Sequence, residues 1–345
     1  MTEGFPIDTF LTIVVCCLAG ANLSFGRPAL WRDLASVALF VFAALTVESG
    51  LLVWVICAAA WSAGCRDVSK RALLVTTAAM LGYFFLRFGL LDVGVPSLEQ
   101  RSSGFGFRTL DPPELISRFG EHPWAFYAYN VLSQVLTVLF AEPKGGVWVF
   151  TRGLLAGELL PRDVVGVASS TGATLLIAWY TVSRITDWRR RVFEHGDRLL
   201  LIFVSVLCAN ALLNYAYTKD VIVSPAGVFH AAAASVAFAR VLTGLGRLPS
   251  VRLPAVAVTI ALACLSAGWA TRLVAAHYSL HDKAFIVRND WMWMGPRPPG
   301  LGLEGNPAGA ALVEQLYDEE VRMRVAGTYF YPDHGQGGRY FEKPW

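Results

Sequence analysis

Apolar stretches long enough to cross a lipid bilayer recur along most of this chain, and they leave it few ways to fold. Of the 345 residues, 55% are hydrophobic and only 16% are charged, whereas an ordinary soluble domain carries roughly 25% charged residues. A helix needs roughly 20 apolar residues to cross the hydrocarbon layer. We therefore expect an all-α, polytopic membrane helical bundle.

The apolar windows predict about eight firm spans and one interrupted pair. The spans are 10–25, 34–47, 49–63, 72–90, 164–183, 199–215, 221–241 and 254–275. The pair, 125–140 and 146–160, is broken by Glu142, Pro143 and Lys144. The sequence therefore predicts a transmembrane domain over 1–275 and a small extracytoplasmic tail over 276–345.

Basic loops set the expected orientation in the cell (inner) membrane. Residues 184–198 and 239–252 are rich in Arg, as are the two early loops that hold Arg27 and Arg32 and then Arg66, Lys70 and Arg71. Lys and Arg favour cytoplasmic loops. This places the loop 91–124 and both termini outside, so the chain between 91 and 163 crosses an even number of times. The interrupted pair over 125–160 is then re-entrant or interfacial.

The distribution of charges indicates the expected partners, and the positions of the cysteines indicate whether a metal site is expected. The formal net charge is only +3 and the basic residues lie in short loops between spans, which is the pattern of topology signals rather than of a nucleic-acid surface. Membrane lipid is the expected partner, and nucleic acid is not. The cysteines show no pairing or clustering with His at metal-site spacing, so the sequence itself indicates no metal ligands.

Glu48 is the one carboxylate in the apolar run 40–55. It lies at the tip of a short helical hairpin that faces the outer surface. It is either a solvated interfacial carboxylate at a turn or a residue that lines an outward-facing site, since ionisable groups at membrane depth usually serve a function.

Other candidate ligand-binding residues lie in the outer segments. In "RSSGFGFR", Arg101 and Arg108 flank a Gly/Ser turn that suits a phosphate; the alternative is a surface turn whose arginines pair with nearby acids. Lys219 and Asp220 either pair with each other or contact an anionic group. Asn210 and Asn214, four residues apart, make one face of their span polar. Shortly after Arg108, the stretch "DPPELISRFG" predicts a short helix between Asp111 and Gly120.

Three stretches resemble GT-C-type membrane glycosyltransferases of the protein O-mannosyltransferase-like superfamily. They are "FAALTVESGLLVW", "AFYAYNVLSQVLTVLFAEP" and "NALLNYAYTKDVIVSPAGVFHAAAA". In the first, Thr46 to Ser49 hold the place of a Ser-Lys-Glu-like turn, with Val47 where the family has Lys. All three belong to the later half of such enzymes, and no long acidic first outer loop precedes them.

The resemblance implies transfer of a sugar from a polyprenyl-phosphate carrier on the outer face, often with a divalent metal. It makes Glu48 a candidate catalytic residue and Arg101, Arg108 and Lys219 candidate phosphate ligands, with Asp220, Asn210 and Asn214 beside them. We expect either such an enzyme or its C-terminal carrier-binding module. The alternatives are a non-catalytic partner of a separately encoded catalytic half and, third, a transporter or lipid flippase.

Overall fold

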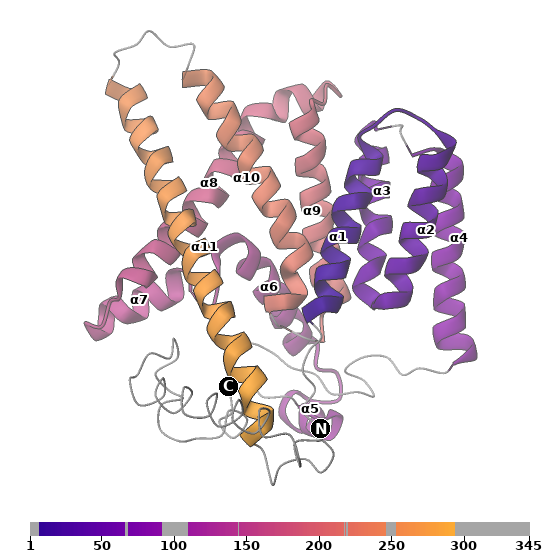
Figure 1. Ribbon diagram of the computed structural model, residues 1–345, viewed down its shortest axis with the longest axis horizontal. Helices are drawn as coiled ribbons and strands as arrows, with labels where there is room; N and C mark the ends of the chain where they lie inside the picture. The colour runs from indigo at the N-terminus through magenta and orange to yellow at the C-terminus, as the bar shows by residue number, and fades with distance from the viewer. Residues whose placement is uncertain are drawn as a thin grey trace, which may run out of the picture. The chain divides into compact units, whose positions relative to one another are not determined.

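The computed structural model describes residues 7–65, 68–91, 110–143, 145–216, 218, 220–245 and 253–293. This described part is built from helices alone and contains no β-strand (Figure 1). The expectation of an all-α chain is confirmed. The chain forms two compact units, Met1–Leu265 and Ser266–Trp345.

Every predicted apolar segment corresponds to a helix. The elements are α1 (Ile7–Ser24), α2 (Leu30–Thr46), the 3₁₀ turn η1 (Glu48–Leu51), α3 (Leu52–Ser62), α4 (Lys70–Phe84), the π-helical η2 (Phe85–Leu90), α5 (Pro112–Phe119), α6 (Trp124–Phe140), α7 (Val147–Ala156), α8 (Pro161–Arg189), α9 (His195–Leu213), the 3₁₀ turn η3 (Asp220–Val223), α10 (Ser224–Leu245) and α11 (Leu253–Trp293).

Within the described part of the chain, five helical segments are long and apolar enough to cross a membrane. They are Lys70–Leu90, Pro161–Arg189, His195–Leu213, Ser224–Leu245 and Ala255–Tyr278. The chain is thus a multi-pass helical membrane protein by length and composition. Shorter apolar helices cover Thr9–Ser24, Glu48–Ser62, Trp124–Phe140 and Val147–Ala156. The count of eight spans remains a prediction.

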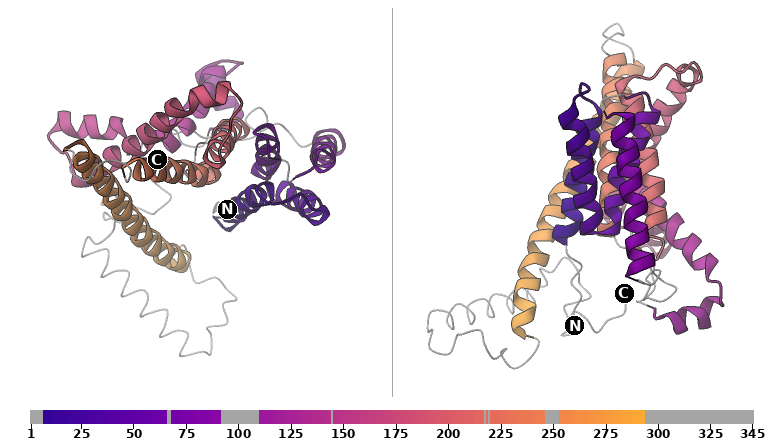
Figure 2. Two further views of the ribbon diagram at one scale, coloured as in Figure 1. Left: turned by 90° about the horizontal axis from the view of Figure 1, so that it is seen from above. Right: turned by 90° about the vertical axis from the view of Figure 1, so that its right-hand side faces the viewer.

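Helix α3 lies at the centre of the first four helices. It packs against α1, α4 and α9, and its buried side chains include Leu52, Val53 and Ile56. A helix that is apolar on all sides is suited to burial on all sides, which explains why the shortest of these four helices takes the inner position. Figure 2 shows α1 to α4 as a group of helices whose axes are roughly aligned with one another.

Helix α9 joins this group to the later helices. It contacts α3 on one side and α10 on the other, and α10 in turn packs on α8. Ile202, Phe203 and Phe229 are buried in the same core as the side chains of α3. Helices α3, α9 and α10 therefore share one continuous apolar core.

Helices α6 and α7 form a bent pair whose apex lies against the middle of α8. Ser170 Oγ donates a hydrogen bond to the Phe140 carbonyl at 3.2 Å, and Thr174 Oγ1 donates to the Leu139 carbonyl. Helix α7 then packs along the first part of α8. The start of α6 lies near the end of α9, where the rings of Tyr127 and Tyr215 meet. The pair thus reaches the middle of α8 and turns back there, and whether it is re-entrant or interfacial in a membrane remains a prediction.

The predicted short outer helix is present as α5. It begins after Asp111 with Pro112 and ends before Gly120, whose φ of 85° suits glycine. Leu115 is buried with Leu110, Phe126 and Tyr127 in a small cluster of its own. This cluster fixes α5 on the start of α6.

Helix α11 continues past Ala275, where the sequence predicts the last span to end, as far as Trp293. No proline lies between Pro254 and Pro296, so nothing in the sequence forces an end at Ala275. The first residues of the predicted tail are therefore helical, and residues 294–345 lie outside the described residues.

Candidate functional site

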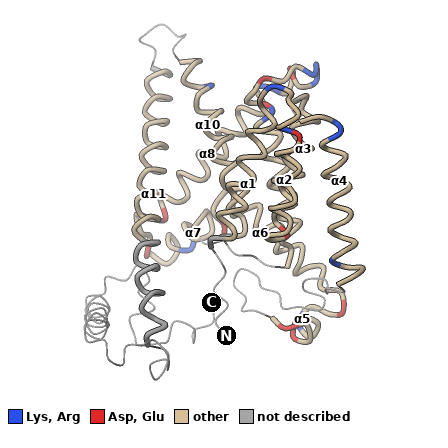
Figure 3. The backbone as a smooth tube through the Cα atoms, turned by 45° about the vertical axis from the view of Figure 1, so that its right-hand side comes forward, with Lys and Arg blue, Asp and Glu red and all other residues tan. Residues whose placement is uncertain are grey.

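The described helix ends of the first unit differ in charge. Basic side chains gather where the α1–α2, α3–α4 and α8–α9 connections lie (Figure 3). We call this the basic end; its residues are Arg27, Arg32, Lys70, Arg71, Arg189, Arg190, Arg191, Arg198 and Arg240. At the opposite end, which we call the polar end, lie η1, η3, the end of α9 and the start of α6.

A break in the chain positions Glu48 at the polar end. Helix α2 ends at Thr46, Val47 is extended, and η1 begins at Glu48. Gly50 allows the break, because a Cβ at this position would lie 2.0 Å from the carbonyl oxygen of Ala43. Only glycine lets η1 approach the α2 backbone this closely.

Glu48 is paired with an arginine. Its Oε1 lies 2.5 Å from Arg87 Nη2, and Arg87 Nη1 donates to the hydroxyl of Tyr83 at 2.7 Å. Arg87 belongs to the π-helical segment η2, a helix type that occurs mostly as single turns and frequently at functional sites. The Glu48 side chain is 44% exposed and that of Arg87 is 17% exposed. The pair is thus open to a ligand on one side.

Arg87 retains an unused donor. Its Nε is buried and has no hydrogen-bond partner within the described part of the chain. A buried unpaired donor costs free energy unless a ligand or water occupies it. Five N–H groups in a planar fork suit a phosphate or carboxylate, so this guanidinium is the best candidate anion ligand among the described residues of the polar end.

An amide network lies next to this pair. Ser49 Oγ donates to Asn214 Oδ1 at 3.5 Å, Asn214 Nδ2 donates to the Asn210 carbonyl at 2.8 Å, and Asn210 Nδ2 donates to the Ile222 carbonyl at 3.1 Å. The network ties η1, α9 and η3 together. Its two carbonyl acceptors lie near the end of α9 and in η3.

Two amides of α6 complete the network from another side. Gln134 Nε2 donates to the carbonyl of Asn214 at 2.8 Å, and Asn130 Nδ2 donates to that of Tyr215 at 2.9 Å. Gln134 is 1% exposed, and its Oε1 is buried with no partner within the described residues. Helix α6 is therefore attached to the end of α9 by polar contacts.

The structure brings together part of the site expected from the sequence. Glu48, Asn210 and Asn214 lie at one end of the bundle, but the asparagine side chains hold backbone groups of the protein. Asp220 begins η3, and its side chain lies outside the described residues. Arg101, Arg108 and Lys219 also lie outside them.

The sequence analysis gave several residues of this end no role in the site. They are Tyr83, Arg87, Asn130, Gln134 and the buried Ser49. Arg87 is the only charged residue of the predicted span 72–90, and an ionisable residue at membrane depth is by itself a signal of function. Its spacing of four from Tyr83 puts the two side chains on one helix face.

Metal ligands do not gather in the described part of the chain. It contains no group of three His, Cys, Asp or Glu side chains that could hold an ion. His230, which is 4% exposed, lies 3.4 Å from Thr174 Oγ1 and edge-on to Phe203. These contacts match a satisfied buried imidazole.

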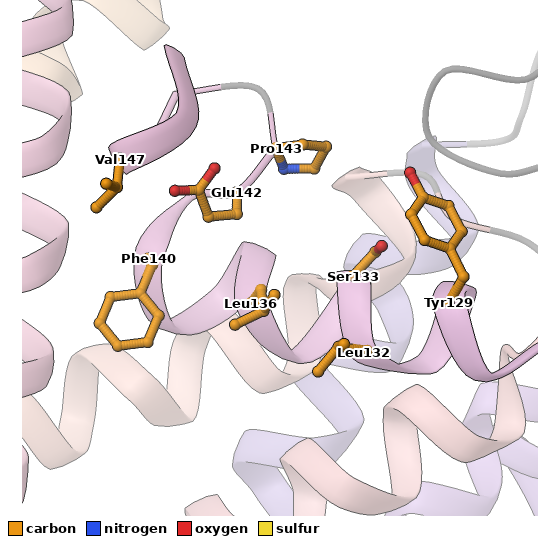
Figure 4. Close-up of a pocket in the computed structure, with 8 residues that line it drawn as sticks. All are labelled: Tyr129, Leu132, Ser133, Leu136, Phe140, Glu142, Pro143 and Val147. Atoms are coloured by element: carbon orange, nitrogen blue, oxygen red, sulfur yellow. The ribbon is translucent and has the colours of Figure 1, made fainter. Parts of the chain in front are cut away.

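A groove of about 490 Å³ lies at the apex of the α6–α7 pair (Figure 4). Its lining is mostly apolar, with Leu132, Leu136 and Phe140 from α6 and Val147 from α7. Glu142 Oε1 accepts the backbone N–H of Trp148 at 3.0 Å, so this carboxylate caps the start of α7. The groove has room for an apolar chain.

A second charged cluster closes the α8–α9 connection at the basic end. Arg184 Nε and Nη2 donate to the two carboxylate oxygens of Asp197 at 3.1 and 2.9 Å, and Tyr180 donates to Asp197 Oδ1 at 2.9 Å. The Asp197 side chain is 0% exposed and that of Arg184 is 5% exposed. Glu194 lies 3.0 Å from Arg184 Nη1 and donates its backbone N–H to Asp197.

No protein-family model, no curated protein and no solved structure matches this chain.

Proposed function

We propose that the chain binds the phosphate of a polyprenyl-linked sugar at the polar end, as a GT-C-like membrane glycosyltransferase or as the carrier-binding module of one. The observation that carries the proposal is the Glu48–Arg87 pair, half-exposed, on a π-helical segment, with an unused donor on the guanidinium. The apolar groove at the apex of α6 and α7 is a candidate place for the lipid chain.

The pair suggests how binding and chemistry are coupled. The phosphodiester of an arriving polyprenyl-linked sugar carries one negative charge, as a carboxylate does, and offers two free oxygens, so it competes with Glu48 for Arg87. Displaced from the guanidinium, Glu48 Oε1 becomes free to accept a proton from an acceptor hydroxyl, provided that the hydroxyl lies within hydrogen-bond reach. Arg101, Arg108 and Lys219 are proposed as further phosphate ligands, and any divalent metal is proposed from the family resemblance alone.

The proposal includes the membrane arrangement. Eight spans, with the short helices α1 to α3 among them, put the basic end in the cytoplasm and the polar end outside the inner membrane. Both termini then lie outside.

The test measures binding of polyprenyl phosphate to the purified protein in nanodiscs. Arg87→Gln should weaken binding by roughly 10- to 150-fold, the equivalent of a charged hydrogen bond of about 1.5–3 kcal/mol. Glu48→Gln should keep binding and lose sugar transfer. Arg162→Ala is the matched control, since that side chain is 63% exposed at the start of α8. Equal binding by all variants would refute the site.

A second candidate is a non-catalytic partner of a separately encoded catalytic half. The internal hydrogen bonds of Asn210 and Asn214 favour it, because these amides hold the protein together rather than facing a substrate. Carrier binding that depends on Arg87, with no transfer by the chain alone and transfer after addition of a second membrane protein, would select this alternative.

A further inference from the structure

A second groove lies between α1 and α2, and none of its lining residues belongs to the candidate site at the polar end. Its volume is about 600 Å³, within the roughly 300–1,000 Å³ of ordinary ligand sites. Six of its lining side chains are apolar: Val15, Leu18, Ala19, Leu23, Ala35 and Leu39; the seventh is Asn22. Val15 and Leu18 are 58% and 44% exposed, so the groove opens at the surface of these two helices.

The groove ends at the basic end of the bundle. Asn22 and Leu23 belong to the last turns of α1, and the connection that follows holds Arg27. Trp31, at the start of α2, is 59% exposed, and tryptophan prefers the level of lipid headgroups. The apolar walls therefore lead from the hydrocarbon layer to the membrane surface.

An arginine is fixed at this end of the groove. Arg32 Nη1 donates to the Leu23 carbonyl at 2.9 Å, and its guanidinium lies 5.0 Å from the centre of the Trp31 ring. The chain wraps closely around it, because a Cβ on Gly26 would lie 1.8 Å from Arg32 Nη1. The hydrogen bonds of Arg32 to the Leu23 and Asn22 carbonyls both come from Nη1, and a guanidinium has further N–H groups that can bind an anion.

The geometry points to a binding site for one anionic phospholipid of the leaflet at the basic end, with an acyl chain in the α1–α2 groove and the phosphate on Arg32 and Arg27. Arg27 is exposed beside the same connection. Two guanidiniums complement a headgroup with net negative charge better than a zwitterionic one, whose ammonium they repel. This site is independent of the function proposed for the polar end.

Native mass spectrometry of the detergent-purified full chain tests the site with added phosphatidylglycerol or phosphatidylcholine of identical acyl chains. The unaltered protein should retain one phosphatidylglycerol per chain and about tenfold less phosphatidylcholine. Arg27→Ala should lower phosphatidylglycerol retention about tenfold, as loss of one charged hydrogen bond would. Arg190→Ala removes an equally exposed arginine of the basic end and should change nothing.

A second pair of variants separates the groove from the charge. Ala35→Leu fills the groove and should lower retention of both lipids, whereas Ala38→Leu adds the same volume to an exposed position of the same helix and should not. Equal retention of the two lipids by the unaltered protein, or equal losses in Arg27→Ala and Arg190→Ala, would overturn the site in favour of general attraction to a basic surface. Retention unaffected by Ala35→Leu would overturn the role of the groove.

Discussion

The two ends of the bundle each hold an arginine–carboxylate pair, and the pairs are built in opposite ways. At the basic end, Arg184 and Asp197 are almost wholly buried and both carboxylate oxygens accept hydrogen bonds. At the polar end, Glu48 is 44% exposed and Arg87 keeps an unused buried donor. A saturated pair has no capacity for a ligand, whereas an incomplete one does. We therefore propose a structural role for the first pair and ligand binding for the second.

Asp197→Ala should have the largest effect on stability. It would leave the Arg184 guanidinium buried beside Tyr180 without its main partner, which costs about 3–5 kcal/mol for a buried pair. Reversible unfolding in mixed micelles with SDS measures the change.

The control for this change is Asp187→Ala. Asp187 also contacts Arg184, at 2.5 Å, but its side chain is 41% exposed, so the loss should stay under about 1 kcal/mol. Similar losses in the two variants would mean that burial does not distinguish them, and the comparison between the two ends would fail.

Gly50→Ala tests whether the break at the polar end is rigid. The new methyl group would meet the Ala43 carbonyl at 2.0 Å, and overpacking of this kind costs about 1–3 kcal/mol. The variant should also move Glu48 away from Arg87, so carrier binding should change with stability.

Gly227→Ala is the matched control. A Cβ on Gly227 meets no described atom within 4 Å, and replacing glycine by alanine inside a helix gains up to about 1 kcal/mol. Unchanged stability of Gly50→Ala would show that η1 moves freely, and the fixed geometry of the Glu48–Arg87 pair would have to be abandoned.

Asn210→Ala removes the amide that joins α9 to η3. The Ile222 carbonyl would lose its donor at a buried position, where an unsatisfied polar group costs about 1–3 kcal/mol. We expect destabilisation of this size in the same SDS titration and little change in the intrinsic affinity for a ligand. A loss of carrier binding without a loss of stability would return Asn210 to the direct substrate contact that the sequence predicts.

The helices of this fold could be predicted from the sequence because each depends on local patterns. Hydropathy windows located every apolar helix, and Asp111, Pro112 and Gly120 bounded α5. The site could be predicted only in part. Glu48 stood out as a lone charge, but its partner Arg87 comes from a different helix, and no spacing rule joins them.

The amide network could not be predicted from the sequence for a related reason. The sequence shows that Asn210 and Asn214 share a face, but most acceptors of the network are backbone carbonyls, which any sequence supplies. Which carbonyls lack partners depends on where α9 ends and where η3 begins. That information exists only once the helices are packed.

Glu48→Gln should have the smallest effect on stability and is the sharpest test of the comparison. The pair is partly exposed, and such pairs contribute about 0.2–1 kcal/mol; a glutamine can still accept a hydrogen bond from Arg87. The free energy of unfolding should therefore change by less than about 1 kcal/mol while sugar transfer is lost. If Glu48→Gln destabilised the protein as much as Asp197→Ala, the Glu48–Arg87 pair would be a second ion pair that mainly stabilises the fold. The non-catalytic partner subunit would then be the better proposal for the function.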